Sequence, residues 1–201
     1  MGHSQASKAE THARIVQIAA DRFRKDGLEG VGVADLMKDA GLTVGGFYKH
    51  FGSREDLVVE ALETALAHSQ ARTQGVVGEA PADRVFEAVV EAYLNAEHRD
   101  EPEHGCAFGA LVGDAGRSAG RVQALFEAQA NKTYDGLARL IAPSAKGEVD
   151  PAVRAKAIAA HSLMVGALNL ARATGPGPLS DEILAAAKSH LVTAFGRGNA
   201  E

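Results

Sequence analysis

Residues 41–51, GLTVGGFYKHF, concentrate side chains that can bind a polyanion. Tyr48, Lys49 and His50 place a hydroxyl, an ammonium and an imidazole at three consecutive positions, and all three groups can donate hydrogen bonds to phosphate oxygens. Two adjacent glycines precede them, although each glycine costs a helix about 1 kcal/mol relative to alanine. Small residues beside cationic and aromatic groups indicate a surface that must come close to a nucleic acid.

Two short helices joined by a tight turn are expected to position this segment. Residues 33–40, VADLMKDA, carry apolar side chains on one face, and Thr43 is a suitable N-cap for a following helix from Val44 to about His50. Gly41 lies in the turn, where a positive φ is common and glycine adopts it without strain. The pattern predicts a helix-turn-helix whose second helix enters the major groove with its N-terminus first.

The second helix is expected to divide its residues between bases, phosphates and the protein core. Val44 can contact a thymine methyl group, while Phe47 and Phe51 are expected to pack on the first helix of the domain. His50 suits either a phosphate contact or a structural hydrogen bond. The predicted DNA contacts are Thr43, Val44, Gly45, Gly46, Tyr48, Lys49, His50 and Arg54.

Composition limits the classes of protein that this chain can represent. It has 201 residues, 46% of them hydrophobic, and a net charge of −5, so any nucleic-acid binding must use a local patch. The single cysteine, Cys106, excludes an internal disulfide, and no apolar run is long enough to cross a membrane. The N-terminus lacks a signal-peptide pattern, and residues 1 to about 8 are expected to form a disordered arm.

Helical periodicity extends over the whole chain, so the predicted fold class is all-α. A helix with Ile15, Ala19 and Phe23 on one face precedes the helix-turn-helix, and Ser53 caps a fourth helix over 53–72. This helix is expected to connect a three-helix DNA-binding domain, 8–52, to a larger helical domain, 53–201. A connection follows from about residue 74, and the remaining predicted helices span 82–99, 105–116, 119–142, 150–173 and 179–196, with Asp150 and Ser180 as caps of the last two.

Residues 11–57 resemble the DNA-binding domain of the TetR family of transcriptional repressors. The resemblance lies in an amphipathic helix ending at Phe23 and Gly27, then VADLMKDAGLT, then GGFYKHFGSREDL. Two positions depart from the family pattern. Gly32 replaces the threonine or serine that usually caps the second helix, and Arg54 replaces a frequent lysine.

The resemblance implies a ligand-responsive repressor that binds a palindromic operator as a homodimer. The last two helices are rich in small residues that allow close helix approach, which agrees with the four-helix dimer interface of the family. The expected interface residues are Gly166, Ala167, Ala171, Ala186 and Leu191. Packing of these helices within their own subunit is the alternative.

The helices between residues 82 and 173 are expected to line a pocket for an apolar or electrophilic small molecule. Cys106 lies near a helix N-terminus, two residues after His104, where a thiolate is favoured. A thiol-based redox or electrophile sensor is therefore one alternative, and a plain buried cysteine is the other. The predicted lining is Phe86, Val89, Val90, Tyr93, His104, Cys106, Phe108, Leu111, Phe126, Gln129, Tyr134, His161, Met164 and Asn169.

Enzyme signatures are missing from the sequence. There is no nucleophile elbow, no phosphate-binding glycine loop after a strand and no HExxH motif, so we expect no catalytic residues, no cofactor and no metal. The expected location is the bacterial cytoplasm, at the nucleoid when DNA is bound. A helical adaptor without DNA binding is the alternative class.

Overall fold

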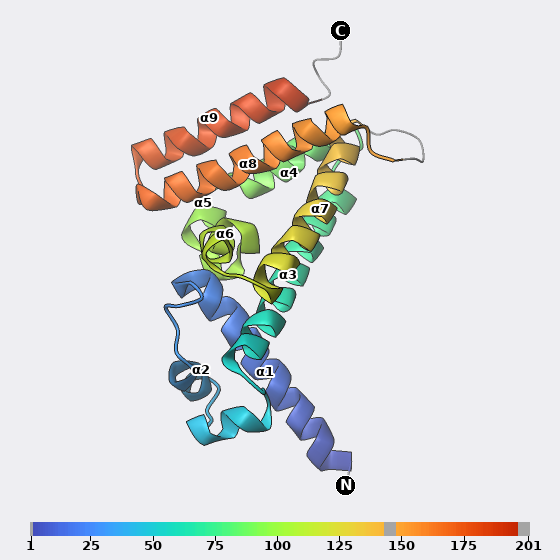
Figure 1. Ribbon diagram of the computed structural model, residues 1–201. Coiled ribbons are helices and arrows are strands. Elements are labelled where there is room, and N and C mark those ends of the chain that lie inside the picture. The colour runs from blue at the N-terminus through green and yellow to red at the C-terminus, as the bar shows by residue number, and fades with distance from the viewer. Residues whose placement is uncertain (1, 143–147, 197–201) are drawn as a thin grey trace. The chain divides into compact units, whose positions relative to one another are not determined.

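The computed structural model describes residues 2–142 and 148–196 as an all-α protein (Figure 1). None of these residues forms a strand, which confirms the predicted fold class. The helices are α1 Gly2–Asp26, α2 Val33–Asp39, α3 Arg54–Glu79, α4 Val85–Tyr93, α5 Ala96–Asp100, α6 Ala107–Arg117, α7 Arg121–Ile141, α8 Pro151–Ala173 and α9 Pro178–Phe195, with the 3-10 helices η1 Val44–Lys49 and η2 Pro102–His104.

Contacts divide the chain into two compact units. Unit 1 comprises Met1–Ser69 and Pro102–Phe126, and unit 2 comprises Gln70–Glu101 and Glu127–Glu201. The helix predicted over 53–72 is present as α3, and its sequence belongs partly to each unit. The division by contacts thus falls inside this helix, whereas the sequence placed a domain boundary before it.

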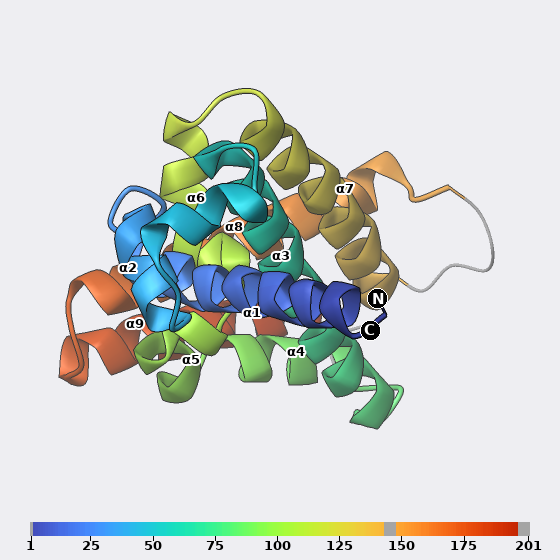
Figure 2. The ribbon, with the colours of Figure 1, turned by 90° about the horizontal axis from the view of Figure 1, so that it is seen from below.

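Unit 1 is built on the apolar stripe of α1. Ile15, Ala19 and Phe23 are almost completely buried, as their spacing predicted, and Leu36 and Met37 of α2 are buried as well. Figure 2 shows α2 and η1 beside α1. α1, α2 and η1 therefore pack together around one small core.

Several helix boundaries differ from those predicted. α1 begins at Gly2, so the expected disordered arm is wrong. α3 continues through Gly75 and Gly78 to Glu79, where a connection was expected, because Val76 and Val77 pack against the core of unit 2. Tertiary burial outweighs the low helix propensity of glycine here.

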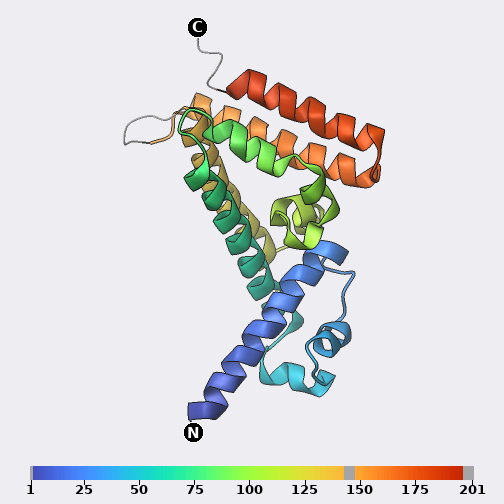
Figure 3. The same cartoon turned by 180° about the vertical axis from the view of Figure 1, so that it is seen from behind.

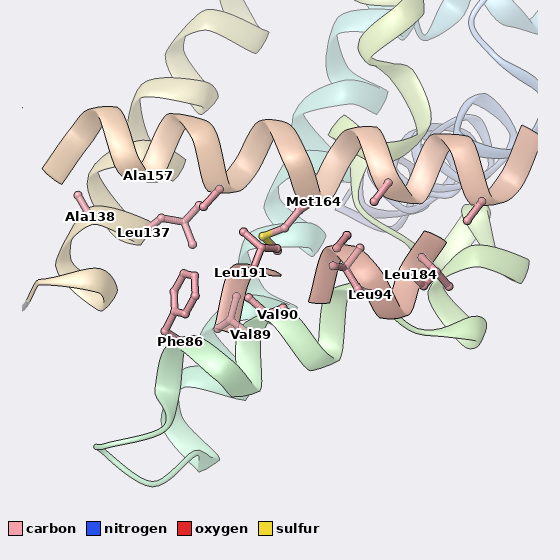
Figure 4. Packing of buried hydrophobic residues seen from close by; sticks show 14 residues of the cluster. Phe86, Val89, Val90, Leu94, Leu137, Ala138, Ala157, Met164, Leu184 and Leu191 are labelled. Atoms are coloured by element: carbon pink, nitrogen blue, oxygen red, sulfur yellow. The ribbon is translucent and has the colours of Figure 1, made fainter. Parts of the chain in front are cut away.

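The core of unit 2 lies between α4, α8 and α9 (Figure 4). Val90, Met164 and Leu191 meet at its centre, each at most 2% exposed. Alanines such as Ala160 of α8 are also fully buried, so the helices approach closely where these small side chains lie. Asp150 caps α8 as predicted, since its carboxylate accepts a hydrogen bond from the backbone N–H of Ala152 at 2.7 Å.

A buried arginine, Arg99, ties α5 to the first turn of α9. The helix predicted over 82–99 breaks at Leu94, because the side chain of Asn95 caps α5 by accepting from the His98 backbone N–H. Arg99 then donates to Ser180 at 3.0 Å and to Asp181 at 2.7 Å. The expected N-cap role of Ser180 is wrong: its hydroxyl donates to the Ala171 carbonyl, and Gly177 occupies the N-cap position of α9.

Two histidines are buried in unit 2 and are held neutral. Burial lowers the pKa of His98 to about 4, and the charges of Arg72 and Arg172 act in the same direction. Its Nδ1 lies 2.7 Å from the carbonyl oxygen of Tyr93, which fixes this nitrogen as the N–H donor. Burial likewise lowers the pKa of His161 to about 4. Both side chains must take up a proton when the chain unfolds in mild acid.

We expect mild acid to destabilise unit 2. The folded pKa values of His98 and His161 lie below the unfolded value, so acid favours the unfolded chain. The free energy of unfolding is therefore unaffected by these histidines above about pH 6.5 and falls as the pH drops towards 4, by about 2 kcal/mol per histidine at pH 5. Urea unfolding at pH 7.5 and pH 5 measures this loss. Between these two pH values His161→Leu should lose less free energy of unfolding than the wild type, whereas the exposed control His190→Leu should lose as much as the wild type. Equal losses in both variants would contradict this account.

Candidate nucleic-acid interface

The turn before η1 has the geometry that a helix-turn-helix requires. Gly41 has a φ of +71°, so a side chain at this position would be strained, as the sequence predicted. Thr43 occupies the N-cap position of η1 with φ −84° and ψ 151°, and its carbonyl accepts from the Gly46 N–H at 2.9 Å. Its side chain makes no capping hydrogen bond, so the hydroxyl stays available to an external acceptor.

The helix predicted from Val44 to about His50 is present as a 3-10 helix, η1. It spans six residues, Val44–Lys49, and Gly45 and Gly46 are the second and third of them. A run this short forms few i→i−4 hydrogen bonds, and two glycines weaken it further. The element therefore depends on tertiary contacts for its shape.

Two phenylalanines provide those contacts. Phe47 is 1% exposed and Phe51 is 2% exposed, and their ring centroids lie 5.3 Å apart. The imidazole of His12 on α1 stacks on Phe51 at 4.5 Å. Both phenylalanines therefore face the core of unit 1, as predicted, and turn the remaining side chains of η1 outward.

The outward face of η1 carries apolar, hydroxyl and cationic groups. Val44 is 51% exposed and Tyr48 is 77% exposed, although both are large side chains that favour burial. Lys49 is exposed, and so are Thr43 and Gly45. A surface valine and a surface tyrosine beside a lysine combine the apolar and hydrogen-bonding groups that contacts with bases and phosphates need.

Arg54 has a structural role that the sequence did not reveal. Its guanidinium donates to the carbonyl oxygens of Leu28 and Val31, and it lies 6.0 Å from the ring centroid of Phe23. The same group pairs with Glu29 at 3.5 Å. Arg54 thus ties the start of α3 to the loop between α1 and α2, because two backbone carbonyls there need a donor. Its predicted DNA contact stays a prediction.

A second structural contact at the start of α3 involves α7. Ser53 and Asp56 form the expected cap, with the Asp56 N–H donating to the Ser53 hydroxyl at 3.1 Å. Arg121 donates to the Asp56 carboxylate at 2.6 Å, and this bond, together with the Ser53 hydroxyl, lowers the pKa of Asp56. No sequence signal relates these two positions, which lie 65 residues apart.

His50 is half-buried beside α1. Its ring centroid lies 5.9 Å from that of His12, whose Nε2 is 2.6 Å from the Glu60 carboxylate of α3. Sequence reasoning missed His12 as part of this site. Its position, three residues before Ile15 on the apolar stripe, was the signal that could have placed it on the inner face of α1.

The predicted ligand residues fall into both units. Within unit 1, Leu111 is fully buried, and Phe108 contacts Phe126 edge to face at 5.2 Å. Cys106 is half-buried at the N-cap position of α6, where its side chain makes no capping hydrogen bond, and His104 is exposed.

Within unit 2, most predicted ligand residues are part of the core. Phe86, Val89, Val90 and Met164 belong to the buried cluster, with Tyr93 packed against its edge. A hollow of about 200 Å³ involves only Phe86 of this set, and it is smaller than typical ligand pockets of roughly 300 Å³ or more. The polar members of the set have partners nearby. The ring centroids of Tyr134 and His161 lie 5.7 Å apart, and the Asn169 amide donates to the Val165 carbonyl. Gln129 is half-buried.

The predicted dimer residues separate into two groups. Ala167, Ala171 and Leu191 are at most 4% exposed, because they face the core of their own chain. These three residues were expected in a dimer interface, but they lie on the inward faces of α8 and α9. Gly166 and Ala186 lie on exposed faces of α8 and α9.

Metal binding and membrane insertion have no support in the described part of the chain. No group of three or more His, Cys, Asp or Glu side chains there could hold a metal ion. No described helix is long and apolar enough to cross a membrane.

The fold and the outward face of η1 define a helix-turn-helix protein of the bacterial regulator type. The family described as "Bacterial regulatory proteins, tetR family" matches residues 15–61. A segment of 93 residues is 30% identical to the HTH-type transcriptional repressor KstR2 of Mycolicibacterium smegmatis, and it spans 45% of each chain. The chain therefore carries the N-terminal domain of the tetR family at residues 15–61.

Solved structures agree on the fold over nearly the whole chain. A TetR transcriptional regulator from Chloroflexus aurantiacus superposes with a TM-score of 0.78 at 23% identity, covering 94% of this chain and 95% of that one. The reduced form of E. coli NemR superposes with a TM-score of 0.74 at 21% identity, covering 90% and 95%. At these identities the likeness establishes the fold alone.

We expect Arg54→Met to lower the free energy of unfolding of unit 1 by about 1–3 kcal/mol, because two backbone carbonyls lose a charged donor. Lys49→Met, which removes an exposed cation of η1, should change it by less than about 0.5 kcal/mol. Thermal unfolding and amide hydrogen exchange of residues 28–31 measure the difference. Unchanged stability with lost DNA binding would support the phosphate role of Arg54.

Proposed function

We propose that this protein is a transcriptional repressor that binds a palindromic operator as a homodimer, in the bacterial cytoplasm and at the nucleoid. The observation that carries the proposal is the anchored, outward-facing η1. Phe47 fixes the element from inside, while Val44 and Tyr48 stay exposed on the outside, beside the exposed Lys49. Contact with DNA accounts for that exposure.

The proposed reading mode combines a close backbone approach with flanking phosphate contacts. Gly45 has open space where a Cβ would lie, so the start of η1 can meet base edges directly. Val44 offers its methyl groups to thymine, and Tyr48, Lys49 and the Thr43 hydroxyl offer donors to phosphates. His50 completes the set on the side of η1 nearest α1.

Dimer formation is proposed through the exposed faces of α8 and α9. Three large apolar side chains on these helices remain exposed in the single chain: Ile158 at 38%, Leu170 at 60% and Leu179 at 57%. Gly166 and Ala186 lie on exposed faces of the same helices and permit close approach. A second copy would cover these surfaces, and a dimer matches two half-sites one turn of DNA apart.

A small apolar effector is proposed to control the repressor. Phe86, Val89, Val90 and Met164 already fill the core of unit 2, so an apolar molecule among them must displace or rearrange part of α4. Such a molecule shifts operator affinity only if it binds the two states of the protein differently.

Selection from a random pool of duplex DNA tests the proposal directly. A repressor should enrich a palindrome and retard it in a salt-sensitive manner in gel-shift assays. A folded dimer that enriches no sequence, even at low salt, would indicate the helical adaptor instead.

We expect Lys49→Ala to weaken binding of the selected duplex almost uniformly across sequence variants. Because one phosphate contact is lost, the slope of log affinity against log salt should fall by about one. The matched control is Lys132→Ala on α7, which removes the same charge from an exposed position in unit 2. Fluorescence anisotropy at several salt concentrations gives both slopes; an unchanged slope for Lys49→Ala would rule out the phosphate contact.

We expect Gly166→Leu to weaken the dimer. A Cβ at this position would have no neighbour within 4 Å in the single chain, so the fold tolerates the side chain and only a close partner helix would clash with it. Gly136→Leu on α7 is the control, because its surroundings are equally open. Sedimentation should show monomers for the first variant and dimers for the second. A wild-type monomer at micromolar concentration would refute the interface.

A further inference from the structure

Two imidazoles, one on α1 and one directly after η1, lie next to each other. The rings of His12 and His50 are 5.9 Å apart, and His12 stacks on Phe51, the residue after His50. The first turns of α1 extend to the same end of unit 1 as η1 (Figures 1 and 3). The pair therefore lies where a DNA backbone bound by η1 would pass.

The surroundings of the pair are mainly cationic. Lys8 and His12 on α1 and Lys49 on η1 act electrostatically on His50, and Glu60 on α3 is the acid in contact with His12. Burial first, and then the positions of His12, Lys8 and Lys49, lower the pKa of His50. Its Nδ1 is enclosed without a hydrogen-bond partner, so an imidazolium in the free protein would leave one N–H unpaired.

We propose that His12 and His50 form a proton-linked phosphate site, which takes up a proton when the DNA backbone binds beside Lys8 and Lys49. The inference rests on the proposed DNA binding and deepens it by assigning Lys8 and His12 of α1 to the interface. A phosphodiester anion neutralises the cations that oppose protonation of His50.

The direction of the pH dependence follows from linkage. An anion beside a titrating imidazole raises its pKa, so the DNA complex holds more protons than the free protein. Operator affinity therefore rises as the pH falls. The gain is complete below the pKa of the free protein, which for His50 lies under the ordinary 6.5, and is lost as the pH rises through the pKa of the complex.

The test is the affinity of the full-length protein for the selected duplex between pH 8 and pH 6 at constant salt. We expect binding about three- to tenfold tighter at pH 6, and the double variant His12→Gln/His50→Gln should lose most of this change. His68→Gln, an exposed histidine on α3, is the matched control and should keep it. Lys8→Gln should weaken binding at both pH values.

Calorimetry on the unmodified protein provides a measurement that does not depend on how the variants fold. The apparent binding enthalpy in two buffers of different ionisation enthalpy reports proton uptake directly. Binding without proton uptake throughout the range from pH 8 to pH 6, or a pH dependence equal in the double variant and the wild type, would overturn the proton-linked site and leave the repressor intact. Absence of binding at every pH would overturn both.

Discussion

Burial of Phe47 and Phe51 is the constraint on which the proposed DNA interface depends. η1 has six residues and two glycines, so its own hydrogen bonds cannot hold it in one conformation. The two rings fix the element against α1, and the chain between them must then present Tyr48 and Lys49 outward. The glycines that weaken the helix are the residues that let its start approach a groove, and the tertiary anchor makes this combination stable.

Charged residues around this anchor serve two different purposes. Arg54 and Arg121 have their guanidinium groups engaged by backbone carbonyls or by Asp56, and they hold the start of α3 in place. Lys49 stays exposed on η1. A net charge of −5 is compatible with DNA binding because the acids near the interface, such as Glu29 and Asp56, pair with the structural arginines.

Unit 2 combines small residues with a few buried polar groups. Alanines on α8 allow close helix packing, while Arg99 and Arg172 satisfy the carbonyls and hydroxyls around the short α5. Buried histidines kept neutral make this core sensitive to acid, because each loses favourable folding energy when it must be protonated. Residues that suggested a ligand pocket from their types alone, such as Val90 and Met164, are core residues in this arrangement.

The sequence by itself determined the all-α class, the stripe of Ile15, Ala19 and Phe23, the Gly41 turn and the caps at Ser53 and Asp150, because each depends on neighbours a few residues away. Tertiary structure decided what local patterns do not contain. It made η1 a 3-10 helix, extended α3 through two glycines, engaged Arg54 with carbonyls 23 and 26 residues away, and placed His12 beside His50. The physical reason is that the role of a cation depends on its partners across the fold and not on its residue type. These partners decide whether the cation stabilises the core or remains free to contact DNA.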